Sequence, residues 1–197
     1  GNLAYALMLA KQVQRGLEAA ERAKQDKVRA FGDRMPELLQ EIRAQGSRFS
    51  RPPVGPAGLH LRLTDSRWAM ALEAIIQNNV EAFLVNSHAD RTLLASILKR
   101  FNLTNPIIVL RFEGAVDYAG GCPDERFLTA LKVLEVDHPI VLKMLVLLSE
   151  AEKQVLIEDR HEAMRVVKQR LPNVAMVYTP KTKIMASRRT ISQTYLF

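Results

Sequence analysis

The hydrophobic pattern of this chain changes its period once, across a short segment rich in proline and glycine. Ahead of that segment, apolar residues recur with alternating spacings of three and four, which is the a and d pattern of a coiled-coil helix. Beyond it, from residue 59, short alternating or continuous apolar runs are separated by amphipathic stretches. The sequence therefore predicts a long helix joined to a body of class α/β (α+β) with mixed sheets.

The helical pattern occupies residues 2–31, which contain no proline and a single glycine, Gly16. The apolar stripe comprises Leu3, Ala6, Ala10, Val13, Leu17 and Ala20. Its next two places fall on Lys24 and Lys27, so the stripe weakens there. Because small alanines allow a partner helix to approach closely, we expect a coiled-coil arm. An amphipathic helix lying on its own domain is the alternative.

Two helix breakers, Gly32 and Pro36, separate this arm from a short second helix over residues 36–44. Proline suits the first turn of a helix, where its missing N–H is not needed. We therefore assign residues 1–45 to the arm helix and the short second helix. Residues 46–58 form a stiff, extended linker that contains three prolines and three glycines.

The rest of the chain is predicted to alternate between strands and helices. Strands are expected at 59–63, 82–85, 106–112, 131–136, 154–158, 174–178, 184–186 and 190–197, and helices at 65–78, 89–101, 140–148 and 162–170. The run 106–112 is continuously apolar, which is typical of a strand covered on both faces. We predict two lobes, residues 59–115 and 116–197, which meet near a glycine-rich loop.

No motif for catalysis, a cofactor or a metal is present. A phosphate-binding loop needs GxxxxGK[ST], and the glycines of the 113–124 loop do not form GxGxxG either. The four histidines have neither one another nor Cys122 at ligand spacing, so no metal is expected. A single cysteine cannot form an internal disulfide, which fits a reducing compartment. No apolar run approaches the length of a membrane span.

Positive charge is concentrated at the two ends of the chain, within a net charge of +7. Residues 1–51 carry ten Lys and Arg against six Asp and Glu, and residues 160–197 carry eight against one. Residues 52–159 carry ten against fourteen and are mildly acidic. Segregated positive charge indicates a surface for a polyanion such as nucleic acid, and solvated basic faces are the alternative.

Eight basic residues are the candidate DNA contacts. They are Lys181, Lys183, Arg188 and Arg189 near the C-terminal end, with Arg48, Arg51, Lys99 and Arg100 as secondary candidates. Strand periodicity places Lys181 and Lys183 on one face. Tyr178 and Tyr195 lie near them in the sequence, and a mix of cations and aromatic rings can bind backbone phosphates and stack unpaired bases.

Several segments resemble the hinge of an SMC (structural maintenance of chromosomes) protein, namely subunit six of the eukaryotic five–six complex. They are 28–39 (VRAFGDRMPELL), 51–58 (RPPVGPAG), 65–73 (DSRWAMALE), 82–85 (AFLV), 88–90 (HAD), 106–109 (PIIV), 128–131 (LTAL) and 155–158 (VLIE). The resemblance covers about residues 28–178. Many SMC hinges have a glycine-rich segment near their C-terminal end, whereas residues 180–190 of this chain contain no glycine.

This resemblance implies a non-catalytic, two-lobed hinge that an arm coiled coil enters and leaves. Such a hinge pairs with the hinge of the partner SMC subunit, and its antiparallel return arm helix would lie outside this sequence. It implies DNA binding near the arm junction, with single strands preferred and duplex possible, in DNA repair and chromosome organisation in the nucleus. ATP hydrolysis would belong to a distant head formed by the termini of the full-length protein.

Two other functions are compatible with the residues. One is an α/β small-ligand or nucleotide-binding domain that uses the glycine-rich loop from Gly114 to Gly121. The other is a coiled-coil adaptor in which the first 45 residues are sufficient to bind a partner.

Overall fold

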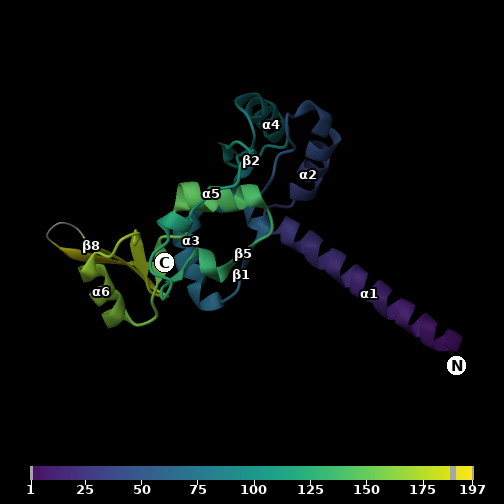
Figure 1. Cartoon of the computed structure of the whole chain (residues 1–197). Coiled ribbons are helices and arrows are strands. Elements are labelled where there is room, and N and C mark those ends of the chain that lie inside the picture. Colours follow the sequence, from purple (N-terminus) through teal and green to yellow (C-terminus); the bar gives the residue numbers. More distant parts are fainter. Residues whose placement is uncertain (1, 187–189, 197) are drawn as a thin grey trace.

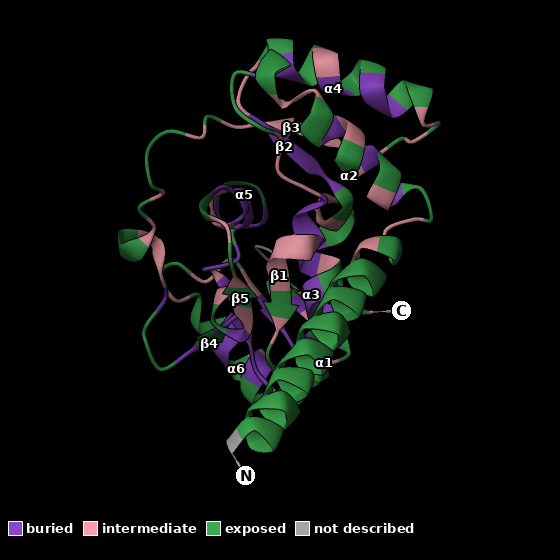
Figure 2. Ribbon diagram, turned by 90° about the vertical axis from the view of Figure 1, so that its right-hand side faces the viewer, coloured by how far each residue is buried: buried purple, intermediate pink, exposed green. Residues whose placement is uncertain are grey.

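The computed structural model describes residues 2–186 and 190–196, and its first helix extends away from a folded body (Figure 1). This helix, α1 (Asn2–Arg29), is exposed along nearly its whole length (Figure 2). Apolar side chains of its stripe face solvent, with Leu3 76% and Leu17 64% exposed. The predicted arm helix is confirmed. No described helix is both long and apolar enough to cross a membrane.

A first core forms where the arm meets the body. After α1 the backbone turns at Gly32, which has a φ of 131°, and α2 (Met35–Ala44) begins with Pro36 in its first turn. One face of α2 packs against α4 (His88–Arg100). The buried residues of this α2–α4 core are Met35, Leu38, Ile42, Phe49, Phe83, Val85, Leu94, Ile97 and Leu98.

A two-stranded parallel sheet separates this core from a second one. It pairs β2 (Phe83–Val85) with β3 (Ile107–Val109). Side chains of a strand alternate between its faces, so Phe83 and Val85 belong to the α2–α4 core while Leu84 belongs to the second core. Strand β3 likewise contributes side chains to both cores, as expected for a strand that is covered on both faces.

The second core lies around two helices in the centre of the molecule. It packs α3 (Ala69–Ile76) and α5 (Pro139–Ser149) beside an antiparallel pair, β1 (Leu61–Leu63) and β5 (Leu134–Val136). Its largest buried side chains include Trp68, Met144 and Leu145. We call this the α3–α5 core.

A five-stranded sheet completes the body on the side away from α1 (Figure 1). Its order is β4 (Leu128–Thr129), β6 (Gln154–Leu156), β7 (Met176–Tyr178), β8 (Thr182–Ala186) and β9 (Ile191–Tyr195). The β6–β7 pair is parallel and the others are antiparallel. Helix α6 (Arg160–Gln169) covers one face, where Val155, Val177 and Ile184 are fully buried.

The structure shortens several expected elements. The strand expected at 106–112 ends at Val109, because the following residues leave the two-stranded sheet to cover the α3–α5 core. The helix expected at 65–78 is α3 flanked by two 3-10 turns, Ser66–Trp68 and Gln77–Glu81. The expected strand 59–63 begins with a further 3-10 turn, Ala57–His60. Strand β4 was not expected, since a two-residue strand has no readable period.

Contacts cross the boundary predicted between the two lobes. Strand β1 comes before that boundary and pairs with β5, which follows it. The α3–α5 core likewise combines Trp68 and Leu72 with Met144 and Leu156. The division into residues 59–115 and 116–197 stays a prediction about domain organisation, and the two segments share one core.

A buried carboxylate anchors the linker to α4. Asp90 is 3% exposed and accepts hydrogen bonds from the backbone N–H of Ser50, at 2.8 Å, and from the Ser50 hydroxyl. The Ser87 hydroxyl caps α4 by accepting from the N–H of Asp90 at 3.1 Å. Burial by itself would raise the pKa of Asp90, but the hydrogen bonds of Ser50 and Ser87 outweigh it and leave the pKa below its usual value.

We expect Asp90→Asn to lower the free energy of unfolding at pH 7 by about 1.5–3 kcal/mol, the range for hydrogen bonds to a charged group. Because folding lowers the pKa of Asp90, its contribution is fully present above the unfolded value of about 3.9 and is lost as pH falls through the folded pKa. Urea unfolding at pH 7 and pH 3 checks this. Asp33→Asn, at an exposed carboxylate, is the control. An equal cost at both pH values would contradict the expectation.

Candidate nucleic-acid interface

The candidate DNA contacts described by the structure fall into two separate regions. Arg48 and Arg51 follow α2, and Lys99 and Arg100 end α4, so these four lie beside the α2–α4 core. Lys183 belongs to β8 of the five-stranded sheet and Lys181 immediately precedes it, in a part of the body away from that core (Figure 1). Arg188 and Arg189 lie outside the described residues.

Two of the four residues beside the α2–α4 core are engaged within the protein. Arg100 donates to Glu41 on α2 at 3.0 Å, and Arg48 donates to the Gln45 side chain at 2.5 Å. The hydrogen bond from Gln45, followed by that from Arg100, lowers the pKa of Glu41. Exposed pairs of this kind contribute little to stability, so Arg100 can exchange Glu41 for a phosphate at small cost. Arg51 and Lys99 are exposed.

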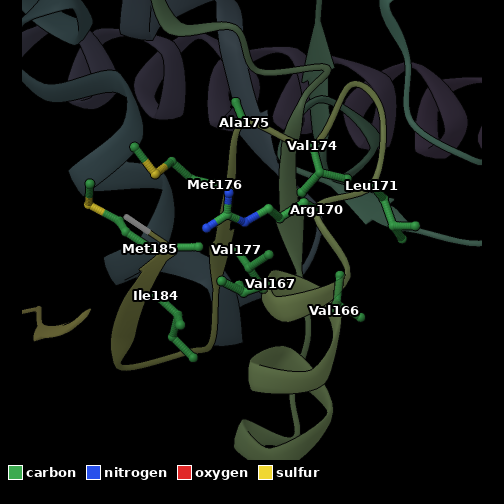
Figure 3. Close-up of a pocket in the computed structure, with 11 residues that line it drawn as sticks. Val166, Val167, Arg170, Leu171, Val174, Ala175, Met176, Val177, Ile184 and Met185 are labelled. Carbon is green, nitrogen blue, oxygen red and sulfur yellow. The ribbon is translucent and has the colours of Figure 1, made fainter. Parts of the chain in front are cut away.

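The alternation along β8 is as expected for the two lysines of the sheet. Thr182 and Ile184 point into the core, whereas Lys181 is exposed and Lys183 half-buried. Beside them, α6, β7 and β8 enclose a pocket of about 310 Å³ (Figure 3). Its walls are mainly aliphatic, with Arg170 as the one basic side chain among its lining residues.

The structure gathers a different set of cations at the arm junction. A groove of about 460 Å³ lies between α1, α2, the linker and the segment that leads into α5. Its basic and titratable lining residues are Lys24, Lys27, Arg43, His60, Asp137 and His138. The floor is apolar and includes Val28, Leu39 and Val54. We call this the arm-junction groove.

Lys27 fixes the arm to the body. Its ammonium donates to the backbone carbonyl oxygens of Leu59, at 2.9 Å, and Leu61, at 3.3 Å. This charge is therefore held at a defined place without a carboxylate partner among the described residues. Lys24 and Arg43 likewise form no ion pair within the part of the chain that the structure describes.

The histidines of the groove add a polar wall. His60 contacts Asp137 through Nδ1 at 2.7 Å, and its ring meets that of His138 edge-on at 5.3 Å. Burial, followed by repulsion from His60, lowers the pKa of His138, and Asp137 opposes this shift. His138 is therefore neutral near pH 7, and its Nδ1 accepts from the N–H of Ile140 at 3.2 Å.

Sequence reasoning missed this groove, although one signal for it was present. Lys24 and Lys27 occupy the places where the apolar stripe of α1 breaks. A lysine at such a place indicates that this part of the helix does not pack against the apolar stripe of a partner helix. Arg43 and His60 carry no comparable signal, because tertiary structure brings them against α1: the turn at Gly32 positions Arg43, and the end of the linker positions His60.

No metal centre accompanies these features: among the residues placed in the structure, no three or more His, Cys, Asp and Glu side chains gather to hold an ion. The cations that line the groove can bind an anion by charge and hydrogen bonding.

No protein-family model matches the chain. Individual proteins are nevertheless similar over most of it. Structural maintenance of chromosomes protein 6 of Schizosaccharomyces pombe is 35% identical over 162 residues, which are 82% of this chain and 14% of that protein. The Homo sapiens protein of the same name is 31% identical over 169 residues, 81% of this chain and 15% of that protein. The chain therefore spans only 14–15% of the length of these relatives.

Solved structures share the fold. The crystal structure of the S. pombe Smc5/6 hinge domain matches with a TM-score of 0.78 and 31% identity, covering 100% of this chain and 80% of that chain. A structure of the folded elbow of cohesin matches with a TM-score of 0.52 at 16% identity, covering 95% of this chain and 27% of that chain, which shows the fold alone. The fold is that of an SMC hinge.

The chain belongs to the SMC6 family, and the region it matches is the hinge of an SMC complex.

Proposed function

We propose that this chain is a non-catalytic hinge that joins the hinge of a partner SMC subunit and binds DNA at the arm-junction groove. The observation that carries the DNA proposal is the convergence of Lys24, Lys27 and Arg43, without carboxylate partners among the described residues, in one groove. Single-stranded DNA suits this groove because its backbone is flexible enough to follow a concave surface between helices. The setting would be chromosome maintenance and DNA repair in the nucleus.

Dimerisation is supported by β9, an edge strand of the five-stranded sheet. The apolar stripe of α1 fits instead the antiparallel return helix of the same arm. Leu196 donates to the carbonyl of Lys181 at 2.9 Å, so alternation along an antiparallel pair directs the N–H groups of Gln193 and Tyr195 away from β8. An open edge of this kind is ready to pair with another strand.

We expect Tyr195→Pro to abolish or strongly weaken association with the partner hinge. Proline removes the outward N–H of residue 195 and retains the bonds to β8, so the edge is blocked while the sheet stays intact. The measurement is the mass in solution of an equimolar mixture with the partner SMC hinge. Tyr195→Phe, which keeps the N–H and the ring, is the matched control.

A complex of unchanged mass and affinity with Tyr195→Pro would remove β9 from the interface. Failure of the unmodified chain to form any complex would overturn the dimerisation proposal itself. The melting temperature of each variant alone shows whether the fold is retained.

DNA binding is tested by titrating single-stranded and duplex DNA across a salt series. Release of condensed counterions makes the affinity fall as salt rises, with a slope of about −0.7 per phosphate contact for a single strand. Affinity that does not depend on salt would exclude a site built from these cations.

A nucleotide site at the glycine-rich loop is not supported by the geometry. The pocket beside that loop contains the buried carboxylate of Glu152, which repels phosphate.

A further inference from the structure

The glycine-rich loop forms one wall of a small pocket on the body of the protein. The pocket encloses about 280 Å³, and it is lined by Tyr118, Cys122, Pro123, Thr129, Leu131, Lys132 and Glu152. Most of this lining is apolar or aromatic. Glu152 precedes β6, and its side chain is the one carboxylate among the lining residues.

Glu152 is buried without a partner for one of its oxygens. The residue is 4% exposed, and Oε2 has no hydrogen-bond partner among the residues that the structure describes. Burial raises the pKa of Glu152; its own backbone N–H and Lys153 lower it, and Glu150 raises it further. A polar group held in this way costs free energy unless something completes its hydrogen bonds. The protein therefore presents an incomplete site at this point.

The nearby lysines are committed elsewhere. Lys132 lines the pocket, but its ammonium donates to the carbonyl oxygens of Glu125, at 3.0 Å, and Phe127, at 2.7 Å. Lys153 pairs with Glu150 at 3.2 Å. Neither forms an ion pair with Glu152, and within the described part of the chain no other cation does so.

We propose that this pocket binds an organic cation, an alkylammonium or guanidinium group, with Glu152 as its counter-ion. The apolar walls suit the carbon chain that carries such a head group, and the aromatic side chain of Tyr118 offers a face that attracts cations. A guanidinium can donate two hydrogen bonds to one carboxylate, which would satisfy Oε2. The source is either a free amine or an Arg or Lys side chain of a partner protein.

Cys122 provides a direct measure of occupancy. It lines the pocket, it is half-buried, and it is the single cysteine of the chain, so alkylation reports on one place. The rate of its reaction with iodoacetamide is followed by intact mass, using the full 197-residue chain. Agmatine is the free-cation probe. The hinge of the partner SMC subunit, with its own cysteines replaced, is the protein probe.

We expect agmatine at about ten times its dissociation constant to slow alkylation about tenfold, because the rate follows the unoccupied fraction. Glu152→Gln removes the charge at nearly constant shape and is expected to abolish this protection. Glu150→Gln, which alters an exposed carboxylate two residues away, is the matched control and should keep it. Each rate is compared with that of the same variant without probe, so altered thiol reactivity cancels.

The two probes distinguish the sources. Protection by agmatine alone assigns a small-amine site, whereas protection by the partner hinge that is lost in Glu152→Gln assigns a partner side chain. Absence of protection by either probe, or protection that Glu152→Gln leaves unchanged, would overturn the proposal and leave the carboxylate to an ordered water. The agmatine result does not depend on whether DNA binding or strand pairing is found, whereas the partner-hinge result rests on the proposed dimerisation, which the mass of the mixture tests separately.

Discussion

Alanine in place of Gly55 is expected to lower the free energy of unfolding by about 3 kcal/mol or more, the combined cost of backbone strain and overpacking. Gly55 has a φ of 154°, and a Cβ there would lie 2.8 Å from both the carbonyl oxygen of Ala82 and the Cα of Phe83. These are backbone atoms of the segment that forms β2, so no side-chain rotation relieves the contact.

The consequence should extend through both cores, because β2 lies between them. At about 2–4 °C per kcal/mol for a domain of this size, the melting temperature should fall by about 6–12 °C. Calorimetry or urea unfolding measures it. Gly120→Ala is the matched control, since nothing lies within 4 Å of a Cβ at Gly120 and its φ is ordinary. Equal stability of the two variants would show that the linker moves to accommodate the methyl group.

Charge reversal in the arm-junction groove is expected to have the second large effect. The double variant Lys24→Glu and Arg43→Glu should weaken binding of single-stranded DNA by about tenfold or more and reduce the salt slope by about 1.4, corresponding to two lost phosphate contacts. Lys27 is left unchanged, because its ammonium holds α1 to the body. Fluorescence anisotropy over a salt series provides both quantities.

Two further variants locate the binding site. Reversal of Arg91 and Arg111, which lie outside the groove, changes the net charge equally and should leave the slope nearly unchanged. Reversal of Lys181, Lys183, Arg188 and Arg189 tests the region that the sequence favoured and should weaken binding less than the groove variant. A larger loss from that set would place the DNA on the five-stranded sheet instead.

The sequence predicts the helices and strands of this protein better than it predicts which of them pair or pack together. Period two correctly placed Lys181 and Lys183 on one face, with buried Thr182 and Ile184 on the other, and the continuous apolar run correctly indicated a strand with a core on each side. Both are local properties of a strand. The pairing of β1 with β5 joins residues more than seventy positions apart, and no local pattern records it.

The candidate DNA site shows the same contrast between local patterns, which the sequence reveals, and tertiary contacts, which it does not. Clustering of charge at the chain ends indicated a polyanion, but the chain ends are not one place in space. Lys181 and Lys183 lie across the body from the arm, whereas Arg43 reaches it because α2 folds back at Gly32, and His60 reaches it at the end of the linker. The resemblance to SMC hinges named the junction, and tertiary structure was needed to name the residues there.

The attachment of the arm has a mechanical consequence. Lys27 holds α1 to the carbonyl groups at the start of β1, and β1 is hydrogen-bonded along its length to β5, from the other half of the chain. Part of a sideways load on the arm is therefore transmitted through Lys27 to a short antiparallel ladder. The direction of the arm is thus coupled to the register of β1 against β5. Bending the arm away from its position would work against this pairing, which closes the α3–α5 core.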